Sequence, residues 1–334
     1  MNLIRLEEVL KAEPSFRLKQ AKQAVFVDLL DNWDKATNFS MQLRSELNEN
    51  CPLSIDAEFF QSIKEDSLKA LITLSDGLKI ETVLLRHSDG RNTVCLSSQV
   101  GCPMGCLFCA TGKMGFKRNL TVEEIIEQAV LFARLLKKED KQINNLVFMG
   151  MGEPFLNYDN VLGAIKFLNN KNNLNIGARH ISISTIGIIE GIKKLANQSL
   201  QINLAISLHA PSNELRVRII PANKKRPIEK IIDAINYYLD KTGRRVMIEY
   251  IMIKDFNDSV EHARQLAELL KQIERPLYFV NLISFNSTGE FKQSDSVKIK
   301  QFREILIRQK IETTLRYRFG QDIKAACGQL AVNE

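Results

Sequence analysis

The sequence contains no apolar run that approaches the roughly 20 residues needed to cross a bilayer. It also has no internal repeat and no low-complexity tract, so neither a repeat array nor a disordered chain is expected. The opening stretch, MNLIRLEEVLKAEP, carries acidic residues at helical spacing and does not resemble a signal peptide. We therefore expect a cytoplasmic protein without a membrane-spanning segment.

Histidine is scarce, and the few cysteines are unevenly placed. None of the four histidines stands in a zinc-finger spacing. Three of the six cysteines, Cys102, Cys106 and Cys109, lie in one short stretch, CPMGCLFCATG. In a reducing compartment, clustered cysteines favour a metal site or catalysis over structural disulfides.

The composition is that of a globular protein, with a basic balance. At 334 residues, 45% hydrophobic and 25% charged, the chain has room for one large α/β domain, or for a core and a small appendage. The net charge of +7 is compatible with a nucleic-acid partner. The basic runs are RLKQAK, KRNL, RVRII, NKKRP and RYR. Gathered around one opening, such runs would form a track for RNA phosphates.

The apolar pattern divides the chain into three parts. Residues 1–75 include SFRLKQAKQAVFVDLLDNWDKA, whose apolar spacing of about 3.6 predicts helices, and we expect a small helical accessory domain that contacts RNA. Residues 76–92 form a β-rich extension that includes IETVLLRH. Residues 93–334 alternate strands with helices and form the core.

In that core, strand-like segments occur at 93–99, 145–150, 180–185, 203–209, 247–253 and 278–285. The helical stretches occur at 121–138, 159–169, 188–197, 228–240, 259–273 and 295–309, and Thr121 with Glu124 forms a capping box for the first. Repeated βα units predict parallel strands covered by helices, as a doubly wound sheet or a barrel. Because six units are too few for a closed barrel, we expect a partial (β/α)6 barrel with a wide mouth for a large substrate.

Ligands of such α/β folds bind at the carboxyl ends of the strands. The cysteine stretch follows the first expected strand, and GMGEP (150–154) follows the second. Ser184, Ser207, His209 and Asn286 lie at or just beyond later strand ends. These features are therefore expected on one face of the core.

The cysteine spacing C-x3-C-x2-C does not suit zinc, which takes four ligands, and Cys95 is poorly placed to be the fourth. An iron–sulfur cubane held by three thiolates leaves one iron open for a substrate. The spacing resembles that of the radical S-adenosylmethionine (SAM) superfamily. This resemblance implies a [4Fe–4S] cluster on Cys102, Cys106 and Cys109, whose open iron binds SAM. One-electron cleavage of the bound SAM would yield a 5′-deoxyadenosyl radical.

The order of the motifs CLSSQVGC, GMGEP, ISTIG, SLHAP, NDS and AACGQL resembles the RlmN/Cfr family of radical RNA methyltransferases over nearly the whole chain. The resemblance implies that Cys327 accepts a methyl group from one SAM and that a second SAM generates the radical. It implies that Cys95 releases the product, leaving a transient Cys95–Cys327 disulfide, and that Glu81 is the base. The SAM contacts implied are Gly152, Glu153, Ser184, Ser207, Leu208, His209 and Asn286. Cys51 has no role in the family.

The resemblance also implies the substrates and partners. An RlmN-like enzyme methylates C2 of an adenosine in the peptidyl-transferase region of 23S rRNA, and often adenosine 37 of tRNA, whereas a Cfr-like enzyme methylates C8 of the same rRNA adenosine. Pro154 resembles the residue of RlmN-like sequences and favours methylation at C2, whereas Phe319 resembles that of Cfr-like sequences and favours C8. A flavodoxin-like electron donor, a thiol reductant and a monomeric state are expected.

Two further alternatives are a non-catalytic iron–sulfur RNA-binding protein and a radical enzyme acting on a small molecule. The presence of both Cys95 and Cys327 disfavours the first. The N-terminal helical segment and AACGQL disfavour the second.

Overall fold

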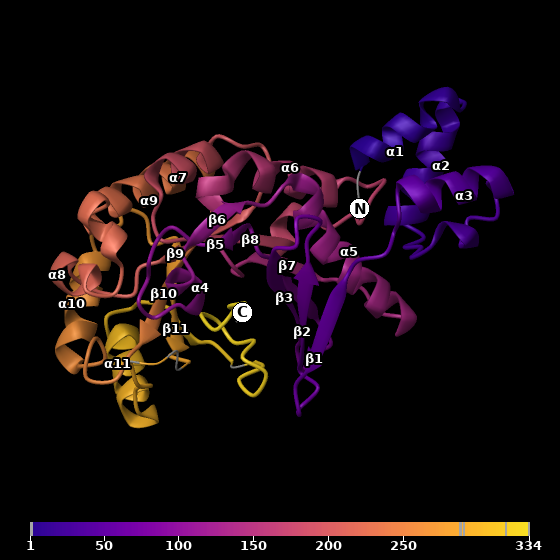
Figure 1. Ribbon diagram of the computed structural model, residues 1–334. Coiled ribbons are helices and arrows are strands. Elements are labelled where there is room, and N and C mark those ends of the chain that lie inside the picture. Colours follow the sequence, from indigo (N-terminus) through magenta and orange to yellow (C-terminus); the bar gives the residue numbers. More distant parts are fainter. Residues whose placement is uncertain (1–2, 287–288, 290, 318, 333–334) are drawn as a thin grey trace.

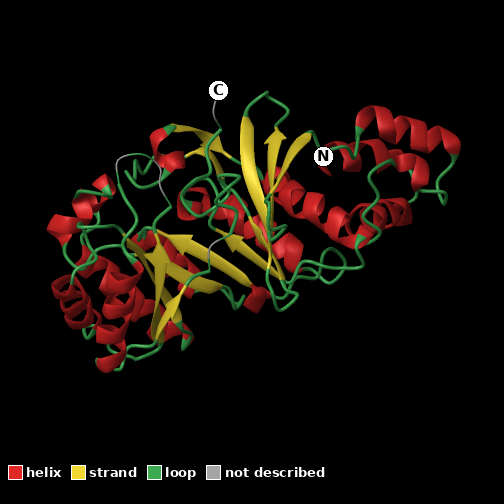
Figure 2. Cartoon of the chain, turned by 90° about the horizontal axis from the view of Figure 1, so that it is seen from below, coloured by secondary structure: helices red, strands yellow, loops and turns green. Residues whose placement is uncertain are grey.

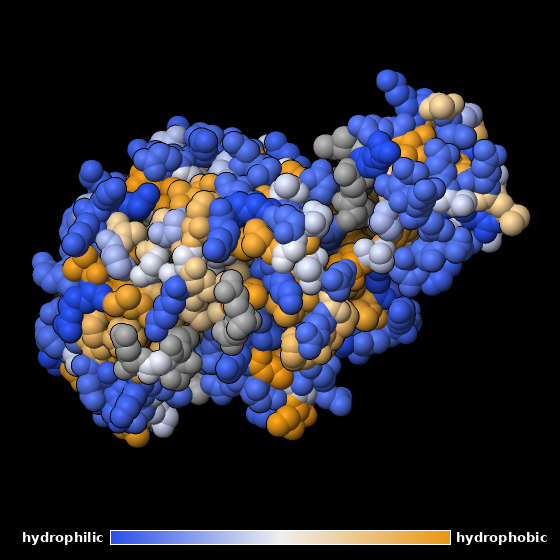
Figure 3. Space-filling model, in the orientation of Figure 1, coloured by the Kyte–Doolittle hydropathy of each residue, from blue (hydrophilic) through white to orange (hydrophobic). Residues whose placement is uncertain are grey.

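The computed structural model describes residues 3–286, 289, 291–317 and 319–332. Its first part is a small lobe built from helices α1 (Leu3–Val9), α2 (Ser15–Phe26) and α3 (Met41–Asn50). They pack around the fully buried Trp33, whose indole nitrogen donates to the carbonyl oxygen of Cys51 at 2.8 Å. The lobe projects from one end of the molecule, and its surface is mainly hydrophilic (Figures 1 and 3).

The helical segment ends earlier than the sequence predicts. In place of helices up to residue 75, strands β1 (Ala57–Gln61), β2 (Ser67–Thr73) and β3 (Lys79–Arg86) form an antiparallel meander. The apolar residues Leu68, Ala70 and Ile72 recur at a period of two in β2, which suits a strand with one buried face. Gly77 turns the chain between β2 and β3 with φ +81°.

The expected parallel strands are present as β4 (Asn92–Cys95), β7 (Asn145–Phe148), β8 (Ile181–Thr185), β9 (Asn203–Ser207), β10 (Val246–Met252) and β11 (Tyr278–Ser284). They pair in chain order within one ten-stranded sheet, with β1–β3 at one edge and a short, unpredicted strand, β12 (Thr313–Leu315), at the other. The sheet is open, so the partial barrel predicted from the sequence is confirmed (Figure 2).

The six predicted helices are present, and each end lies at most three residues from its predicted position. They are α5 (Val122–Lys138), α6 (Tyr158–Asn169), α7 (Ile189–Ala196), α9 (Ile228–Thr242), α10 (Val260–Leu270) and α11 (Ser296–Arg308). They cover the outer face of the sheet (Figure 1). The predicted capping box of α5 is present, because the Thr121 hydroxyl accepts from the Glu124 amide while the Glu124 carboxylate accepts from the Thr121 amide. The sheet and these helices enclose most of the apolar core.

The cysteine stretch does not directly follow the first barrel strand. β4 ends at Cys95, and β5 (Gln99–Gly101) then pairs with β6 (Phe116–Asn119) in a separate hairpin that encloses the loop and the short helix α4 (Ala110–Lys113). The predicted strand stops early because buried Ser97 leaves the ladder, its hydroxyl donating to the Glu81 carbonyl at 2.6 Å. Gly101 is required at the hairpin, since a Cβ there would lie 1.9 Å from the Gly115 carbonyl oxygen.

The described residues after β12 form no further helix or strand and cross the open side of the barrel, beside β3 and α4 (Figure 1, yellow). Among the residues that the structure describes, no helix is both long enough and apolar enough to span a membrane.

Candidate active site

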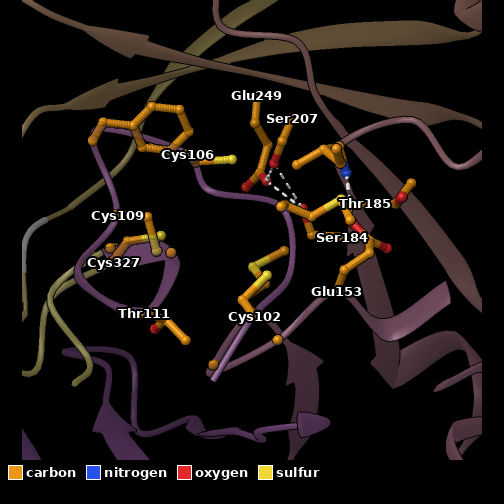
Figure 4. Close-up of a pocket in the computed structure, with 18 of the residues that line it drawn as sticks. Cys102, Cys106, Cys109, Thr111, Glu153, Ser184, Thr185, Ser207, Glu249 and Cys327 are labelled. Atoms are coloured by element: carbon orange, nitrogen blue, oxygen red, sulfur yellow. Dashed lines mark hydrogen bonds between the residues drawn. The ribbon is translucent and has the colours of Figure 1, made fainter. Parts of the chain in front are cut away.

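Three thiols line one cavity on the inner side of the barrel. Cys102, Cys106 and Cys109 face it from the loop between β5 and β6, and the ends of β7–β11 form the opposite wall (Figure 4). The cavity encloses about 900 Å³, counted to its open mouth. The loop is held tightly, because a Cβ at Gly112 would lie 2.8 Å from the Cys106 carbonyl oxygen. The sequence therefore folds into a closely packed loop that presents all three cysteines to the same cavity.

The donor set of this cavity fits an iron–sulfur cluster. Thiolates are the usual ligands of such clusters, and each binds a separate iron. Within the described residues, no three histidine, cysteine or acidic side chains are placed to share a single metal ion. Burial raises the pKa of the Cys102 thiol to about 12, so this group is protonated unless a metal binds it. The arrangement thus suits a cubane better than zinc.

On one side of the cavity, Glu153 is buried and held by backbone amides. Its carboxylate accepts from the Phe155 amide at 3.0 Å and the Ile186 amide at 2.9 Å. Burial raises its pKa to about 7, and these two amides oppose the rise. Gly152, with φ +101°, lets the chain pass against Gln99, where a Cβ would lie 2.6 Å away. A carboxylate so placed can accept hydrogen bonds from an ammonium group.

A polar network crosses the next three strand ends. The Ser184 hydroxyl lies 2.7 Å from Oε2 of Glu249, and the Ser207 hydroxyl lies 3.2 Å from the same atom (Figure 4). Arg316 pairs with the other oxygen of Glu249 at 3.2 Å. Glu249 was not predicted as a site residue, although an acidic residue within the apolar strand VMIEYIM is a usable signal.

His209 and Leu208 follow β9 in different environments. His209 lines the cavity, and its Nδ1 accepts from the Ile251 amide at 3.2 Å. Burial lowers the pKa of His209 to about 3, so the ring is neutral. Leu208 is buried and does not line the cavity, while its carbonyl oxygen accepts from Nε of Arg216 at 2.8 Å.

A second pocket adjoins the first and contains the other two thiols of interest. Cys95, at the end of β4, and Cys327, on the C-terminal segment, both line it, and Cys327 also lines the first cavity. Burial, with a smaller effect of the neighbouring Cys327, raises the pKa of Cys95 to about 12. Burial also raises the pKa of Cys327, and the positive charge of Arg316, which lines this pocket, opposes the rise at both thiols.

Hydrogen bonds anchor the segment that carries Cys327. The Ala110 amide donates to the Gly328 carbonyl oxygen at 2.8 Å, and the Thr111 hydroxyl donates to the Leu330 carbonyl oxygen at 2.6 Å. These two bonds attach the segment to the cysteine loop. Asn286 donates to the Cys327 carbonyl oxygen at 3.2 Å. Asn286, expected at SAM, therefore lines the second pocket and not the first.

Glu81, on β3, contacts the end of this segment. Its carboxylate pairs with Lys69 at 2.6 Å and accepts from the Ala331 amide at 2.9 Å. Burial raises its pKa, and Lys69 opposes the rise. Glu81 lines neither pocket, so the structure does not bring this residue to the other predicted catalytic groups.

Two expectations require correction. All six cysteines are free, so a standing Cys95–Cys327 disulfide is not supported. Arg216, in the run RVRII expected to face RNA, is fully buried and donates to the Ser207 and Ile186 carbonyl oxygens. An arginine that satisfies strand-end carbonyls stabilises the core and is not available to phosphate. Arg318, in the run RYR, lies outside the described residues.

Comparisons with known proteins agree with this geometry. The model of the radical SAM superfamily matches residues 96–269. Relatives named "Probable dual-specificity RNA methyltransferase RlmN" from Dictyoglomus thermophilum and Dictyoglomus turgidum are 47% and 48% identical, over 95% of this chain and 91% of each relative. The crystal structure of a radical SAM methyltransferase from Sphaerobacter thermophilus superposes with a TM-score of 0.93 at 40% identity, covering 99% of this chain and 97% of that one. The chain therefore belongs to the RlmN family of radical SAM RNA methyltransferases.

Proposed function

We propose that this protein methylates C2 of adenosine, both in the peptidyl-transferase region of 23S rRNA and at position 37 of tRNA, in the cytoplasm. The observation that carries the proposal is the placement of Cys327, which lines both the three-thiol cavity and the pocket of Cys95. A thiol at that junction can receive a methyl group on one side and present it to a base on the other. The name of the relatives, at 47% and 48% identity, supports C2 over the C8 alternative.

Within this proposal, the residues divide into three groups. Cys102, Cys106 and Cys109 hold a [4Fe–4S] cluster. Glu153, Gly152, Ser184, Ser207 and His209 line the same cavity and would hold SAM, with the Glu153 carboxylate as the acceptor for its ammonium group. When bound, the cluster and SAM supply the radical chemistry that an electron-poor adenine carbon needs, with two SAM molecules used per turnover.

The remaining steps belong to side chains of the second pocket. Cys327 carries the methyl group, and Asn286 holds its backbone in place. Cys95 lies on β4, and attack of its thiolate on the Cys327 sulfur would break the bond from that sulfur to the transferred carbon. The S–S bond formed in this step would be transient and reopened by a thiol reductant, so the resting structure has both cysteines free. Because Arg316 opposes the rise in the pKa of both buried thiols, it favours the thiolate that this attack needs. Glu81 is the proposed base, and it must leave the Ala331 amide to act.

We further propose that the N-terminal helical lobe contacts RNA as an accessory domain and that β1–β3 join it to the catalytic barrel. Exposed Lys19, Lys224 and Lys225 remain candidates for phosphate contacts. Arg118 is a weaker candidate than its sequence suggests, since it pairs with Asp76 and Glu124. A flavodoxin-like donor and a thiol reductant would complete the cycle of a monomeric enzyme.

The test is anaerobic reconstitution of the cluster, reaction with a 23S rRNA fragment or tRNA, and mass spectrometry of the nucleosides. We expect 2-methyladenosine from both RNAs, and none from a Cys327→Ala variant that retains the cluster. A product of 8-methyladenosine would establish the alternative carbon. The absence of any methylated adenosine would refute the methyltransferase proposal.

A further inference from the structure

A groove outside the two thiol pockets has properties that neither the cluster nor SAM explains. It lies between the turn that joins β1 to β2, which carries Lys64, and helix α11, which carries Lys300 and Arg303. It encloses about 1350 Å³, counted to its open face. The β1–β2 hairpin and α11 lie on either side of the C-terminal segment (Figure 1).

The groove runs directly into the pocket of Cys95 and Cys327. Ser284, Arg316 and Tyr317 line both, so the two spaces share a wall. The turn that carries Lys64 is held against the C-terminal segment, because the Ile63 amide donates to the Asp322 carboxylate at 2.7 Å. A polymer with one unit in the thiol pocket would therefore place a neighbouring unit in this groove.

The charge of the groove suits phosphate. Its charged lining residues are Lys64, Lys300, Arg303 and Arg316, and no carboxylate of a described residue lines it. The charge of Arg316 is neutralised by Glu249. Arg303 keeps its charge, and its side chain is oriented by a hydrogen bond from Nε to the Thr313 carbonyl oxygen at 3.2 Å. Across the described part of the chain, neither Lys64 nor Lys300 forms an ion pair, and both are exposed. Three cationic groups thus remain for a polyanion.

An exposed ring stands where the groove meets the pocket. Tyr317 is 60% exposed, although it also lines the buried thiol pocket. Its ring is held edge-on by Phe319 at 4.7 Å between centroids, and Phe319 in turn packs on His87 at 5.0 Å. A supported, solvent-facing ring is the platform on which unpaired bases stack.

We propose that this groove binds the single-stranded RNA next to the target adenosine, with phosphates on Lys64, Lys300 and Arg303 and the adjacent base stacked on Tyr317. The proposal rests on the proposed function, and it assigns the substrate contact of the same site. It also gives Phe319 a physical role, which is to support Tyr317.

The test measures equilibrium binding of a fluorescent RNA of about nine nucleotides with a central adenosine, within the usual site size for single strands. The full-length, cluster-reconstituted protein is compared with Lys300→Ala/Arg303→Ala over a series of salt concentrations. Losing two phosphate contacts should weaken binding and reduce the slope of log affinity against log salt by about 1.4. Lys171→Ala/Lys230→Ala removes the same charge from exposed positions outside the groove and should leave both quantities unchanged.

The stacking contact is tested separately. Tyr317→Ala should weaken binding on the order of 10-fold, whereas Tyr317→Phe keeps the ring and should bind as the wild type does. Circular dichroism confirms that each variant is folded. If the groove variants bind RNA as tightly as the wild type, the inference is wrong even when the wild type methylates RNA. If they bind RNA normally but are reduced more slowly by flavodoxin, the groove is the site of the electron donor. A wild type that neither binds nor methylates RNA would overturn both proposals.

Discussion

The ion pair between Lys69 and Glu81 is buried beside the C-terminal segment, and replacing Lys69 tests how much this pair contributes to stability. Lys69 and Glu81 lie 2.6 Å apart, and their side chains are only 10% and 5% exposed. Lys69 also lies 5.0 Å from the centre of the Phe60 ring. Because solvent screens this pair little, breaking it in Lys69→Met should lower the free energy of unfolding by about 3–5 kcal/mol.

The size of this loss should depend on pH. Burial already raises the pKa of Glu81, and removing Lys69 raises it further. A carboxyl group whose pKa is higher in the folded state binds its proton more readily there, so its contribution to stability is lost as the pH rises through the folded-state pKa. The difference between Lys69→Met and the wild type should therefore be small at acidic pH and should increase towards pH 8.

The assay is urea unfolding followed by circular dichroism. Fluorescence of the single tryptophan, Trp33, would report only on the N-terminal lobe. At pH 8, the midpoint for Lys69→Met should fall on the order of 1 M urea. Adding Glu81→Gln to that variant should restore most of the loss, and the exposed control Lys79→Met should change little. A loss below about 1 kcal/mol that does not vary with pH would refute the reasoning.

Three further predictions concern the chemistry. Cys95→Ala should leave a covalent protein–RNA adduct, visible on denaturing gels, while Cys51→Ala turns over normally; normal turnover by Cys95→Ala would remove its assigned role. Since the pKa of Glu153 is about 7, SAM affinity in equilibrium dialysis should fall as the pH drops below 7, and Glu153→Gln should abolish that dependence and weaken binding on the order of 10-fold or more. Arg316→Met should shift the pH profile of product release to higher pH, and Arg316→Lys should partly restore it; an unchanged profile would contradict the electrostatic role.

The sequence predicted the barrel well because its strands and helices are strongly periodic. The capping box at Thr121 marked the start of α5 to the residue. The errors had two causes. The period of two in β2 is short and was overlooked beside the longer helical pattern that precedes it, and β2 is fixed as a strand by pairing with β3. The end of β4 is set by a tertiary contact, because the Ser97 hydroxyl donates to the Glu81 carbonyl.

The sequence predicted most residues of the candidate site, but not the contacts between them. Motif spacing placed Cys102, Cys106 and Cys109 in one loop, and the structure brings all three to one cavity. Sequence patterns do not reveal which strand ends meet, so Glu249 was missed. Nor do they reveal burial, so Arg216 was assigned to the surface.

The attachment of the C-terminal segment has a consequence for motion. The contact between Ala331 and Glu81 joins residues 250 positions apart, and that between Thr111 and Leu330 joins residues 219 apart, yet each is a single hydrogen bond. Together with the bonds from Ala110 to Gly328 and from Asn286 to Cys327, they hold the segment one contact at a time, without a strand ladder. Cys95, in contrast, lies on β4, which pairs with β3 on one side and β7 on the other. Exchange of amide hydrogens should therefore be faster at residues 328–331 than in β4, and loss of a single contact should loosen the segment without unfolding the barrel.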